Sequence, residues 1–319
     1  MPGNTLAADK LSAYLGTLLS KLAGDTPQNQ TLAETLVWHD LIGRPAQGVA
    51  RFQALYHDIR EGRITHPCQP ALIKKNHSGA RLDGDNGPGQ TVATQAMDQA
   101  MTLAREAGMG LVTVGNSHDP GTAAYEVQRA ARQNLVALAF GTSAPCMAAH
   151  GGSEPVLGEN RLAFAAPRST DQPLLFEMLT TAPDPAPGLL KGTAPLIQTT
   201  LQPFAGAKGY CLAVMVEILA GILSGNAEGE SGDTGQCFVA IDISRFMPAA
   251  EFQDRMEELY GFIKASGDDP SSLHLPGEAR WQLLAQHQQQ GITLDPGTAR
   301  ELAALGQEHG LTWPAGDLP

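Results

Sequence analysis

The chain has 319 residues, with 33 acidic and 21 basic side chains and a formal net charge of -12. Hydrophobic residues make up 42% of it and charged residues 17%, which is typical of a globular protein and excludes a largely disordered chain. The acidic balance argues against nucleic acid or an anionic membrane surface as a partner, because both bind to cationic faces. The length suits one large domain or two ordinary ones.

The cysteine and hydropathy patterns indicate in which compartment the protein is expected. The four cysteines, Cys68, Cys146, Cys211 and Cys237, are widely spaced and match neither a zinc motif nor a disulfide framework. No apolar run reaches the length of about 18 residues that a membrane-spanning helix needs, and the first residues lack the pattern of a signal peptide. We therefore expect reduced core thiols and a cytoplasmic protein without a membrane partner.

The first sixty residues show the apolar spacing of three helices, over 6–22, 27–41 and 47–62. Thr26 is a suitable N-cap for the second helix, and Pro27 suits its first turn. In the third helix, Phe52, Leu55 and Tyr56 fall on one face together with Ile59, which predicts that this face is buried.

Beyond Pro70 the pattern changes to alternating helices and strands. We expect helices over 92–106, 122–132 and 210–223, and strands over 111–114, 135–140, 162–165, 174–178 and 237–243. The segments 181–206 and 227–235 have the composition of loops. The helix over 210–223 is apolar on nearly all sides, which predicts burial in a core or at a subunit contact.

Three further helices are expected at the end of the chain, over 249–265, 278–289 and 296–309. Helices at both ends and an alternating middle predict an α/β protein with helical terminal segments.

Local motifs leave several possibilities for chemistry. Neither GxGxxG nor GxxxxGK[ST] occurs. The segment 83–89, Asp-Gly-Asp-Asn-Gly-Pro-Gly, lacks the ligand spacing and final glutamate of a calcium loop, so we interpret it as a turn and expect no metal. The glycines over 151–158 fit either a ligand-binding loop or a plain turn. His118 lies between a strand and a helix, where it fits either ligand binding or loop capping.

A family resemblance emerges when motifs are followed along nearly the whole chain. They are Asp40-Leu41-Ile42-Gly43, Gln47-Gly48-Val49-Ala50-Arg51-Phe52, Asp83 to Gln90, Asn116-Ser117, Tyr125, Gly151-Gly152, Leu157-Gly158, Lys208-Gly209-Tyr210, Leu219-Ala220-Gly221 and Leu275-Pro276-Gly277-Glu278. In order and spacing they resemble the type-2 malate/L-lactate dehydrogenase family, which contains NAD(P)H-dependent reductases of 2-oxo and cyclic 2-imino acids.

The resemblance implies a dinucleotide-binding α/β domain that is not a Rossmann fold, and a helical domain built from both chain ends. We accordingly expect an N-terminal helical segment over 1–70, a cofactor-binding domain over 71–245 and a C-terminal helical segment over 246–319 that packs with the first. It also implies a homodimer with its active site near the subunit contact, NADPH or NADH as cofactor, and a small carboxylate substrate.

The chain departs from the family where the chemistry is expected. Gln47 stands where the family has its acid/base histidine, and glutamine cannot deliver a proton at neutral pH. Arg51 matches the arginine that holds the substrate carboxylate, a role that suits a bidentate guanidinium. Counting back six residues from Tyr125 places the second family histidine at Asp119. Either aspartate has replaced it, or a one-residue insertion leaves His118 to fill the site.

Other expected site residues also follow from the resemblance. Glu177 takes the place of a family aspartate, and Arg161 takes the place of a proline and favours NADPH weakly, because a 2′-phosphate binds a cation. The segment 181–208 is shorter than the family's active-site loop. The residues expected to hold the cofactor are Thr142, Ser143, Gly152, Gly158, Asn160, Arg161 and Lys208.

Three interpretations of these departures remain open. The first is reduction of a C=N substrate, which needs no strong proton donor because the iminium nitrogen is already protonated. In this case Arg51 holds the carboxylate and Gln47 orients the reacting group. The second moves the acid/base role to His118, Asp119 or Glu177. In the third, hydride transfer is lost and the fold serves a non-redox reaction or a binding role.

Overall fold

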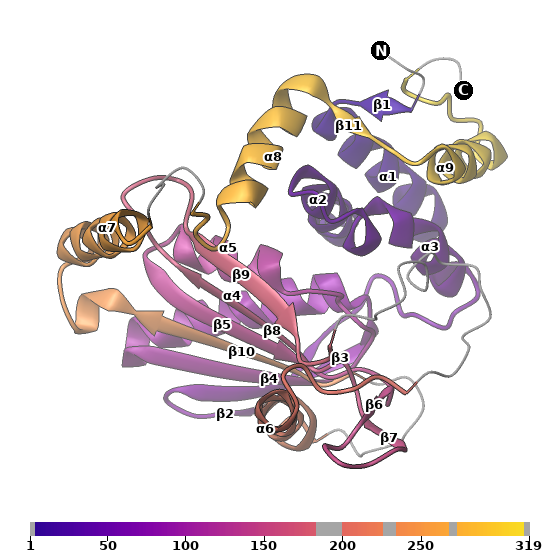
Figure 1. Cartoon of the computed structure of the whole chain (residues 1–319). Helices are drawn as coiled ribbons and strands as arrows, with labels where there is room; N and C mark the ends of the chain where they lie inside the picture. The colour runs from indigo at the N-terminus through magenta and orange to yellow at the C-terminus, as the bar shows by residue number, and fades with distance from the viewer. Residues whose placement is uncertain (1–3, 183–199, 226–233, 268–272, 316–319) are drawn as a thin grey trace.

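The computed structural model describes residues 4–182, 200–225, 234–267 and 273–315. Its centre is a seven-stranded sheet in the order β2-β3-β4-β10-β5-β8-β9 (Figure 1). These strands span Ala71–Lys75 (β2), Gly79–Gly87 (β3), Met109–Ser117 (β4), Leu135–Gly141 (β5), Arg161–Ala166 (β8), Leu174–Leu179 (β9) and Gln236–Asp242 (β10). The α/β class is confirmed, and all five strands expected from the sequence are present.

The directions of the strands exclude a Rossmann fold. Only β3 and β4 run parallel, whereas every other neighbouring pair in this sheet is antiparallel. A doubly wound dinucleotide fold instead has a mostly parallel sheet. The expectation of a non-Rossmann α/β domain is therefore confirmed.

Strands β2 and β3 were not expected, and the turn predicted over 83–89 is wrong. The segment continues β3 to Gly87, with an irregularity between Asp83 and Gly87 where Asp85 and Asn86 take φ values of 55° and 52°. Its polar residues hide the period-two pattern of a strand, because a bulge shifts the alternation of faces. Asp83 accepts hydrogen bonds from the Asp85 N–H and the Asn116 side chain.

Helices cover both faces of the sheet. On one face, α4 (Gly89–Ala107) and α5 (Ala124–Ala131) form a tightly packed core with the strands. Gly110 of β4 allows this packing, because a Cβ there would lie 2.1 Å from the Ala100 carbonyl oxygen. On the other face lie α6 (Ala207–Val216) and its π-helical continuation, Glu217–Ile222.

A second core joins the two chain ends. Helices α1 (Ala8–Ala23), α2 (Pro27–Leu41) and α3 (Phe52–Arg60) pack with α9 (Pro296–Glu308), and β1 (Thr5–Leu6) pairs with β11 (Ile292–Thr293) (Figure 1). Thr26 caps α2 as expected, accepting a hydrogen bond from the Gln28 N–H. The helical unit built from both ends is confirmed.

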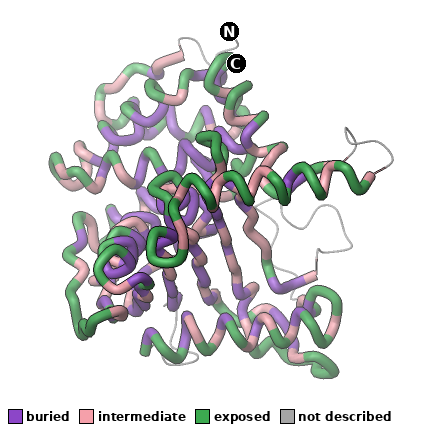
Figure 2. Tube along the Cα trace, turned by 90° about the vertical axis from the view of Figure 1, so that its left-hand side faces the viewer, coloured by how far each residue is buried: buried purple, intermediate pink, exposed green. Residues whose placement is uncertain are grey.

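The remaining helices are α7 (Ala249–Ala265) and α8 (Glu278–Gln290), and both were expected. Helix α8 contacts α2, whereas α7 lies at the end of the sheet, where its Glu257 pairs with Arg168 (Figure 1). Only Tyr260 of α7 is buried, and Figure 2 shows that buried residues concentrate in the sheet and its covering helices.

Two expected helices are altered. The helix predicted over 47–62 is split into the 3-10 turns Pro45–Gln47 and Val49–Arg51, followed by α3. The helix over 210–223 is buried on one side only: Val216 and Ala220 pack on the sheet, whereas Ile218 and Ile222 are 49% and 59% exposed. Burial in the core of one chain was therefore wrong for this helix, and the alternative of a subunit contact stays a prediction.

Gly151 and Gly152 lie in the turn that joins β6 (Met147–Ala148) to β7 (Pro155–Leu157) in a small hairpin, and Gly158 directly follows β7. Most of the two expected loops, 181–206 and 227–235, lies outside the described residues. All four cysteines are free, but only Cys68 and Cys237 are buried, so the expectation of core thiols is wrong for Cys211, which is exposed, and for Cys146, which is partly exposed. Among the described residues, no helix has the length and hydropathy required to cross a membrane.

Candidate active site

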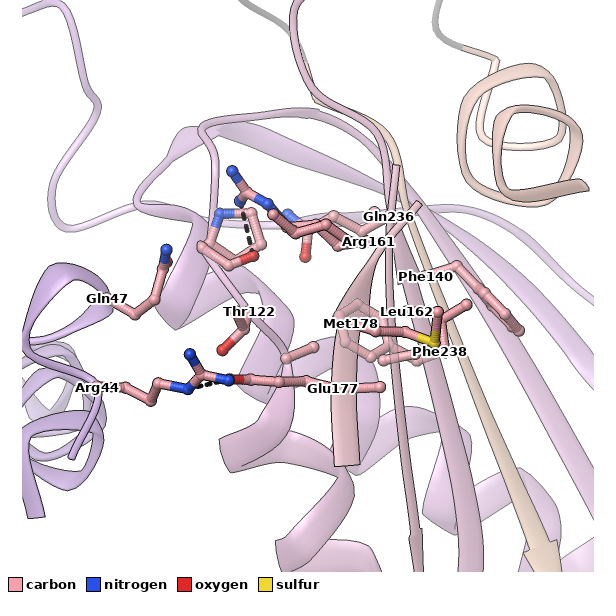
Figure 3. A pocket seen from close by; sticks show the side chains of 17 residues that line it. Arg44, Gln47, Thr122, Phe140, Arg161, Leu162, Glu177, Met178, Gln236 and Phe238 are labelled. Atoms are coloured by element: carbon pink, nitrogen blue, oxygen red, sulfur yellow. Dashed lines mark hydrogen bonds and ion pairs between the residues drawn. The ribbon is translucent and has the colours of Figure 1, made fainter. Parts of the chain in front are cut away.

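A cavity of about 150 Å³ lies between the N-terminal helical segment and the sheet (Figure 3). One wall carries Arg44, Gln47 and Thr122, and the opposite side is apolar, with Phe140, Leu162 and Met178. The strands β5, β8, β9 and β10 and the loop before α5 complete the lining. A small cavity with one apolar side and convergent polar groups is typical of a site for a small molecule.

Asp40 positions the loop that carries Gln47. Its Oδ2 atom accepts a hydrogen bond of 2.6 Å from the Val49 N–H. A Cβ at Gly48 would lie 2.0 Å from the same oxygen, so only glycine lets the loop approach Asp40 this closely. Burial raises the pKa of Asp40 to about 7. The Asp40-to-Gly48 motif thus serves to brace the cavity wall.

Arg51, Asp119, Glu159 and Arg161 form one group of ion pairs beside the cavity, the Asp119 cluster. Asp119 Oδ1 accepts hydrogen bonds from Arg161 Nη1 at 2.7 Å and from the Gly121 N–H at 2.8 Å. Asp119 Oδ2 lies 3.3 Å from Arg51 Nη2, and Arg161 also binds Glu159 at 2.7 Å. Burial alone would raise the pKa of Asp119, but Arg161 and Arg51 outweigh it and hold the pKa below its usual value. Asp119 is therefore ionised at neutral pH.

A second group, the Glu177 cluster, consists of Arg44, Glu177 and Arg280. Glu177 Oε1 lies 3.1 Å from Arg44 Nε and 3.3 Å from Arg280 Nη2. The side chain of Glu177 is only 5% exposed, yet its Oε2 atom has no hydrogen-bond partner, and neither has Arg280 Nη1. Because buried polar atoms are normally paired, these atoms indicate an incomplete site.

The structure separates the two candidates for the family's second histidine. Asp119 lies beside Arg51 and Arg161, whereas the His118 ring turns away and its Nε2 contacts Asn86 Oδ1 at 2.8 Å. His118 is outside the cavity wall, and Gln47 and Glu177 are part of it. Of the four residues expected to be catalytic, the structure thus places Gln47 and Glu177 in the cavity wall and Asp119 beside it, where it binds the wall residue Arg161.

Of the residues expected to hold the cofactor, only Arg161 lines this cavity. Thr142 and Ser143 are engaged in backbone contacts: the Thr142 hydroxyl accepts from the Gly235 N–H at 2.9 Å, and the Ser143 hydroxyl accepts from the Glu159 N–H at 3.0 Å. Gly158 is buried against Ser143, since a Cβ there would lie 2.3 Å from the Ser143 carbonyl oxygen.

Asn160 connects the start of β8 to α6 and its π-helical continuation. Its side-chain nitrogen donates to the Ala213 carbonyl at 2.9 Å and to Glu217 Oε2 at 2.8 Å. Lys208 itself is exposed in the first turn of α6, and Gly152 is exposed in the hairpin between β6 and β7. Apart from Arg161, these residues therefore build or flank the edge of the sheet next to the cavity.

Sequence reasoning missed four polar residues at or behind the cavity. Arg44 and Thr122 line it, Arg280 completes the Glu177 cluster, and His39 is fully buried behind Thr122. The one available signal was His39 itself, a histidine within the apolar run at the end of the second predicted helix. No sequence signal pointed to Arg280, because α8 is far from the other site residues in sequence.

The comparisons with known proteins agree with this fold. A family model described as malate/L-lactate dehydrogenase matches residues 6–185 and 183–303. The malate dehydrogenase of Pyrococcus abyssi is 29% identical over 95% of this chain and 94% of its own length. The L-sulfolactate dehydrogenase of Methanothermobacter thermautotrophicus is 29% identical over 87% of this chain and 89% of its own.

Solved structures give the same result. The malate dehydrogenase of Pyrococcus horikoshii superposes with a TM-score of 0.87 at 28% identity, covering 96% of each chain. The delta1-piperideine-2-carboxylate reductase of Pseudomonas syringae superposes with a TM-score of 0.82 at 25% identity, covering 94% of this chain and 99% of its own. The chain belongs to the malate/L-lactate dehydrogenase family.

Proposed function

We propose that the protein is a NAD(P)H-dependent oxidoreductase that reduces the C=O or C=N group of a small 2-oxo or 2-imino carboxylate. The observation that carries the proposal is the cavity, in which an apolar side faces two arginines, Arg44 and Arg161, and the carboxylate of Glu177. The relatives named as malate and sulfolactate dehydrogenases and as a piperideine-carboxylate reductase support this range of substrates.

The cavity fits the nicotinamide end of the cofactor. Ala139, Gly141 and Ala163 are among the residues that line it, and their small side chains leave room for a flat ring. Gln236 Oε1 and Glu177 Oε2 are acceptors without partners on residues that line the cavity, and they suit the N–H groups of a carboxamide. The cofactor supplies the hydride, and the protein holds and orients the substrate. NADH and NADPH both remain in the proposal, because the guanidinium of Arg161 is already bound to Asp119 and Glu159.

Arg51 is proposed to hold the substrate carboxylate. Its contacts with other side chains are long, at 3.3 Å to Asp119 Oδ2 and 3.4 Å to Gln47 Oε1, whereas Asp119 Oδ1 is held at 2.7 Å by Arg161. Arg51 Nη2 also donates to the Asp119 backbone carbonyl at 3.0 Å, and this bond anchors the guanidinium without using the Asp119 carboxylate. A bidentate bond to a carboxylate is stronger than these long contacts. Arg51 therefore exchanges Asp119 Oδ2 for the substrate, while Arg161 keeps Asp119 in place.

A homodimer is also part of the proposal. Met215, Ile218 and Ile222 follow helical spacing on α6 and its continuation, and they are 37% to 59% exposed. An exposed apolar stripe of this kind favours an interface with a second copy. An Ile222→Asp variant is expected to be monomeric, and light scattering after size-exclusion chromatography measures this. A wild-type protein that is monomeric at micromolar concentration would contradict the dimer.

The decisive experiment is cofactor binding followed by turnover. We expect saturable quenching or enhancement of NADH or NADPH fluorescence, then oxidation of the cofactor by 2-oxo acids or cyclic 2-imino acids. An Arg51→Ala variant should raise KM for the carboxylate substrate at least tenfold, while Arg60→Ala, an exposed arginine of α3, should not. The absence of saturable binding of both cofactors would overturn the oxidoreductase and favour a non-redox role.

A further inference from the structure

His39 is held in a single tautomer in the last turn of α2. Its ring is 0% exposed, and its Nδ1 atom lies 2.8 Å from the Thr35 carbonyl oxygen. Because a carbonyl only accepts, Nδ1 carries the ring proton. The Nε2 atom of the neutral ring is then a bare acceptor, and it lies 3.1 Å from the Thr122 hydroxyl oxygen.

Thr122 connects this buried ring to the cavity. It belongs to the loop before α5, lines the cavity and is 8% exposed. Figure 3 shows it on the same side as Gln47 and the Arg44–Glu177 pair. Since its hydrogen is donated to His39, its oxygen presents lone pairs that accept a hydrogen bond from a ligand hydroxyl.

The surroundings of His39 keep the ring neutral at neutral pH, so that Nε2 is a bare acceptor. Burial lowers the pKa of His39 most, and Arg51 before α3 and Arg280 of α8 lower it further. Glu177 of β9 and the Thr35 carbonyl act in the opposite direction. The carboxylate of Glu177, with its unpaired oxygen, therefore offsets the charge of a transiently protonated ring.

We propose that Thr122 and His39 form the proton relay of the site, an assignment that rests on the proposed oxidoreductase function. When a 2-hydroxy acid is oxidised, its O–H bond breaks and the proton passes to Thr122 Oγ1, whose own proton passes to His39 Nε2. The carbinol C–H bond breaks as hydride leaves for the oxidised nicotinamide, so the substrate carbon loses two electrons and the cofactor gains them. Reduction of a 2-oxo acid follows the same route in reverse.

The relay solves a problem that the other cavity residues leave. Gln47 has no titratable proton, and Asp119 is held ionised by Arg51 and Arg161. His118 faces away from the cavity. Thr122 with His39 is thus a route for a proton in a site that has glutamine and aspartate at the two family histidine positions. In this assignment Thr122 is the catalytic residue, and His39 acts through it.

The first test compares substitutions of Thr122. Thr122→Val, which keeps the shape and removes the hydroxyl, should lower kcat for hydroxy-acid oxidation about 100-fold, the usual range for proton-transfer catalysis. Thr122→Ser should retain activity within a few-fold. Thr113→Val, another buried threonine on β4 outside the cavity, is the matched control and should not change kcat. Full activity of Thr122→Val would overturn the relay.

A second measurement is independent of turnover. In protein without cofactor, ¹⁵N NMR of labelled histidine should show His39 with protonated Nδ1 and bare Nε2, and Thr122→Val should shift the Nε2 resonance. The acid limb of kcat/KM for oxidation should titrate below pH 6.5 in the wild type and disappear in Thr122→Val. A His39 ring with protonated Nε2 would overturn the relay. This measurement uses the wild-type protein, so it does not depend on whether a substitution of the buried His39 folds.

The outcomes separate the relay from the proposed function. Wild-type protein that binds neither NADH nor NADPH would refute both. Wild-type protein that reduces cyclic imino acids, with Thr122→Val equally active and no oxidation of hydroxy acids, would refute the relay and leave the oxidoreductase standing.

Discussion

The Asp119 cluster and the Glu177 cluster flank the same cavity, yet only the first has all of its buried side-chain nitrogen and oxygen atoms hydrogen-bonded. In the Asp119 cluster two arginines balance two carboxylates, and each charged side chain has an ion-pair partner. In the Glu177 cluster two arginines share one carboxylate, and Glu177 Oε2 and Arg280 Nη1 remain unbonded.

This difference indicates a division of labour. A neutral, fully bonded group costs little to bury and fixes neighbouring backbone, as Asp119 does for Gly121. A group with unbonded buried atoms carries a cost in desolvation free energy, which another favourable interaction must offset. A bound ligand that pairs with these atoms supplies such an interaction. We infer that the Asp119 cluster shapes the cavity and that the Glu177 cluster serves the ligand and the charge on His39.

The largest effect is expected from Gly121→Ala, which breaks the Asp119 cluster. Gly121 has a φ of 77°, and a Cβ there would lie 2.2 Å from Arg51 Nη1 and 2.4 Å from Gln47 Oε1. We expect the free energy of unfolding to fall by about 3 kcal/mol, from left-handed strain and displaced side chains, and kcat/KM to fall at least 100-fold. Denaturant unfolding and steady-state kinetics measure the two effects.

Gly62→Ala is the matched control for this substitution. Gly62 has a φ of 73° with no atom within 4 Å of a Cβ, so it carries the backbone strain without the contacts. It should lose about 1 kcal/mol of stability and keep its activity. Equal losses of activity in both variants would show that strain alone, and not the position of Arg51 and Gln47, matters.

Glu177→Gln tests the other side of the comparison. It leaves Arg280, with a side chain 15% exposed, without its buried counter-charge. We expect a loss of about 2 kcal/mol in the free energy of unfolding and a larger loss of kcat than in Glu159→Gln, which weakens the Asp119 cluster instead. If Glu159→Gln impairs kcat more, the assignment of ligand chemistry to the Glu177 cluster is wrong.

Asp119→Asn is expected to have a small effect on stability. Unlike the other substitutions at the site, it is expected to strengthen substrate binding. It frees Arg51 for the substrate, so KM for a 2-oxo acid should fall several-fold, while stability falls by about 1 kcal/mol because the carboxylate is one-third exposed. An unchanged or higher KM would argue against Arg51 as the carboxylate ligand.

The pH dependence of stability gives an independent check on Asp119. Its folded pKa lies below the ordinary value of 3.8. Its contribution to stability is therefore complete above the unfolded pKa and is lost as the pH falls below 3.8 through the folded pKa. Asp119→Asn should flatten this acid limb in an unfolding series from pH 5 to pH 2. An acid limb equal to that of the wild type would contradict the lowered pKa.

Much of the fold was predictable because local pattern and burial agree. Helix α4 and the central strands β5 and β10 have an apolar periodicity, and the apolar residues it predicts are buried together in the core. Strands β2 and β3 were missed for the opposite reason: β2 is fully exposed at the edge of the sheet, and the irregularity in β3 interrupts its alternation. Their pairing with β4 depends on residues that are distant in sequence.

The site was predictable only in part. The motifs identified Gln47, Arg51 and Asp119 as positions of interest, yet they did not decide between Asp119 and His118. Two adjacent residues of a loop point in opposite directions, and the hydrogen bond from the Gly121 N–H to Asp119 fixes which one faces the arginines. Residue order alone does not contain that choice.

The sequence by itself determined the family, the α/β class, the helical unit built from both ends and the replacement of the first family histidine by Gln47. These properties follow from patterns and identities that are local in the chain. Only the tertiary structure decided which polar groups surround the cavity, because the loop before α5 and β9 bring Thr122 and Glu177 to its wall, and α2 and α8 place His39 and Arg280 directly behind them. Proton transfer and ion pairing depend on distances of a few ångströms between such residues, and folding alone sets those distances.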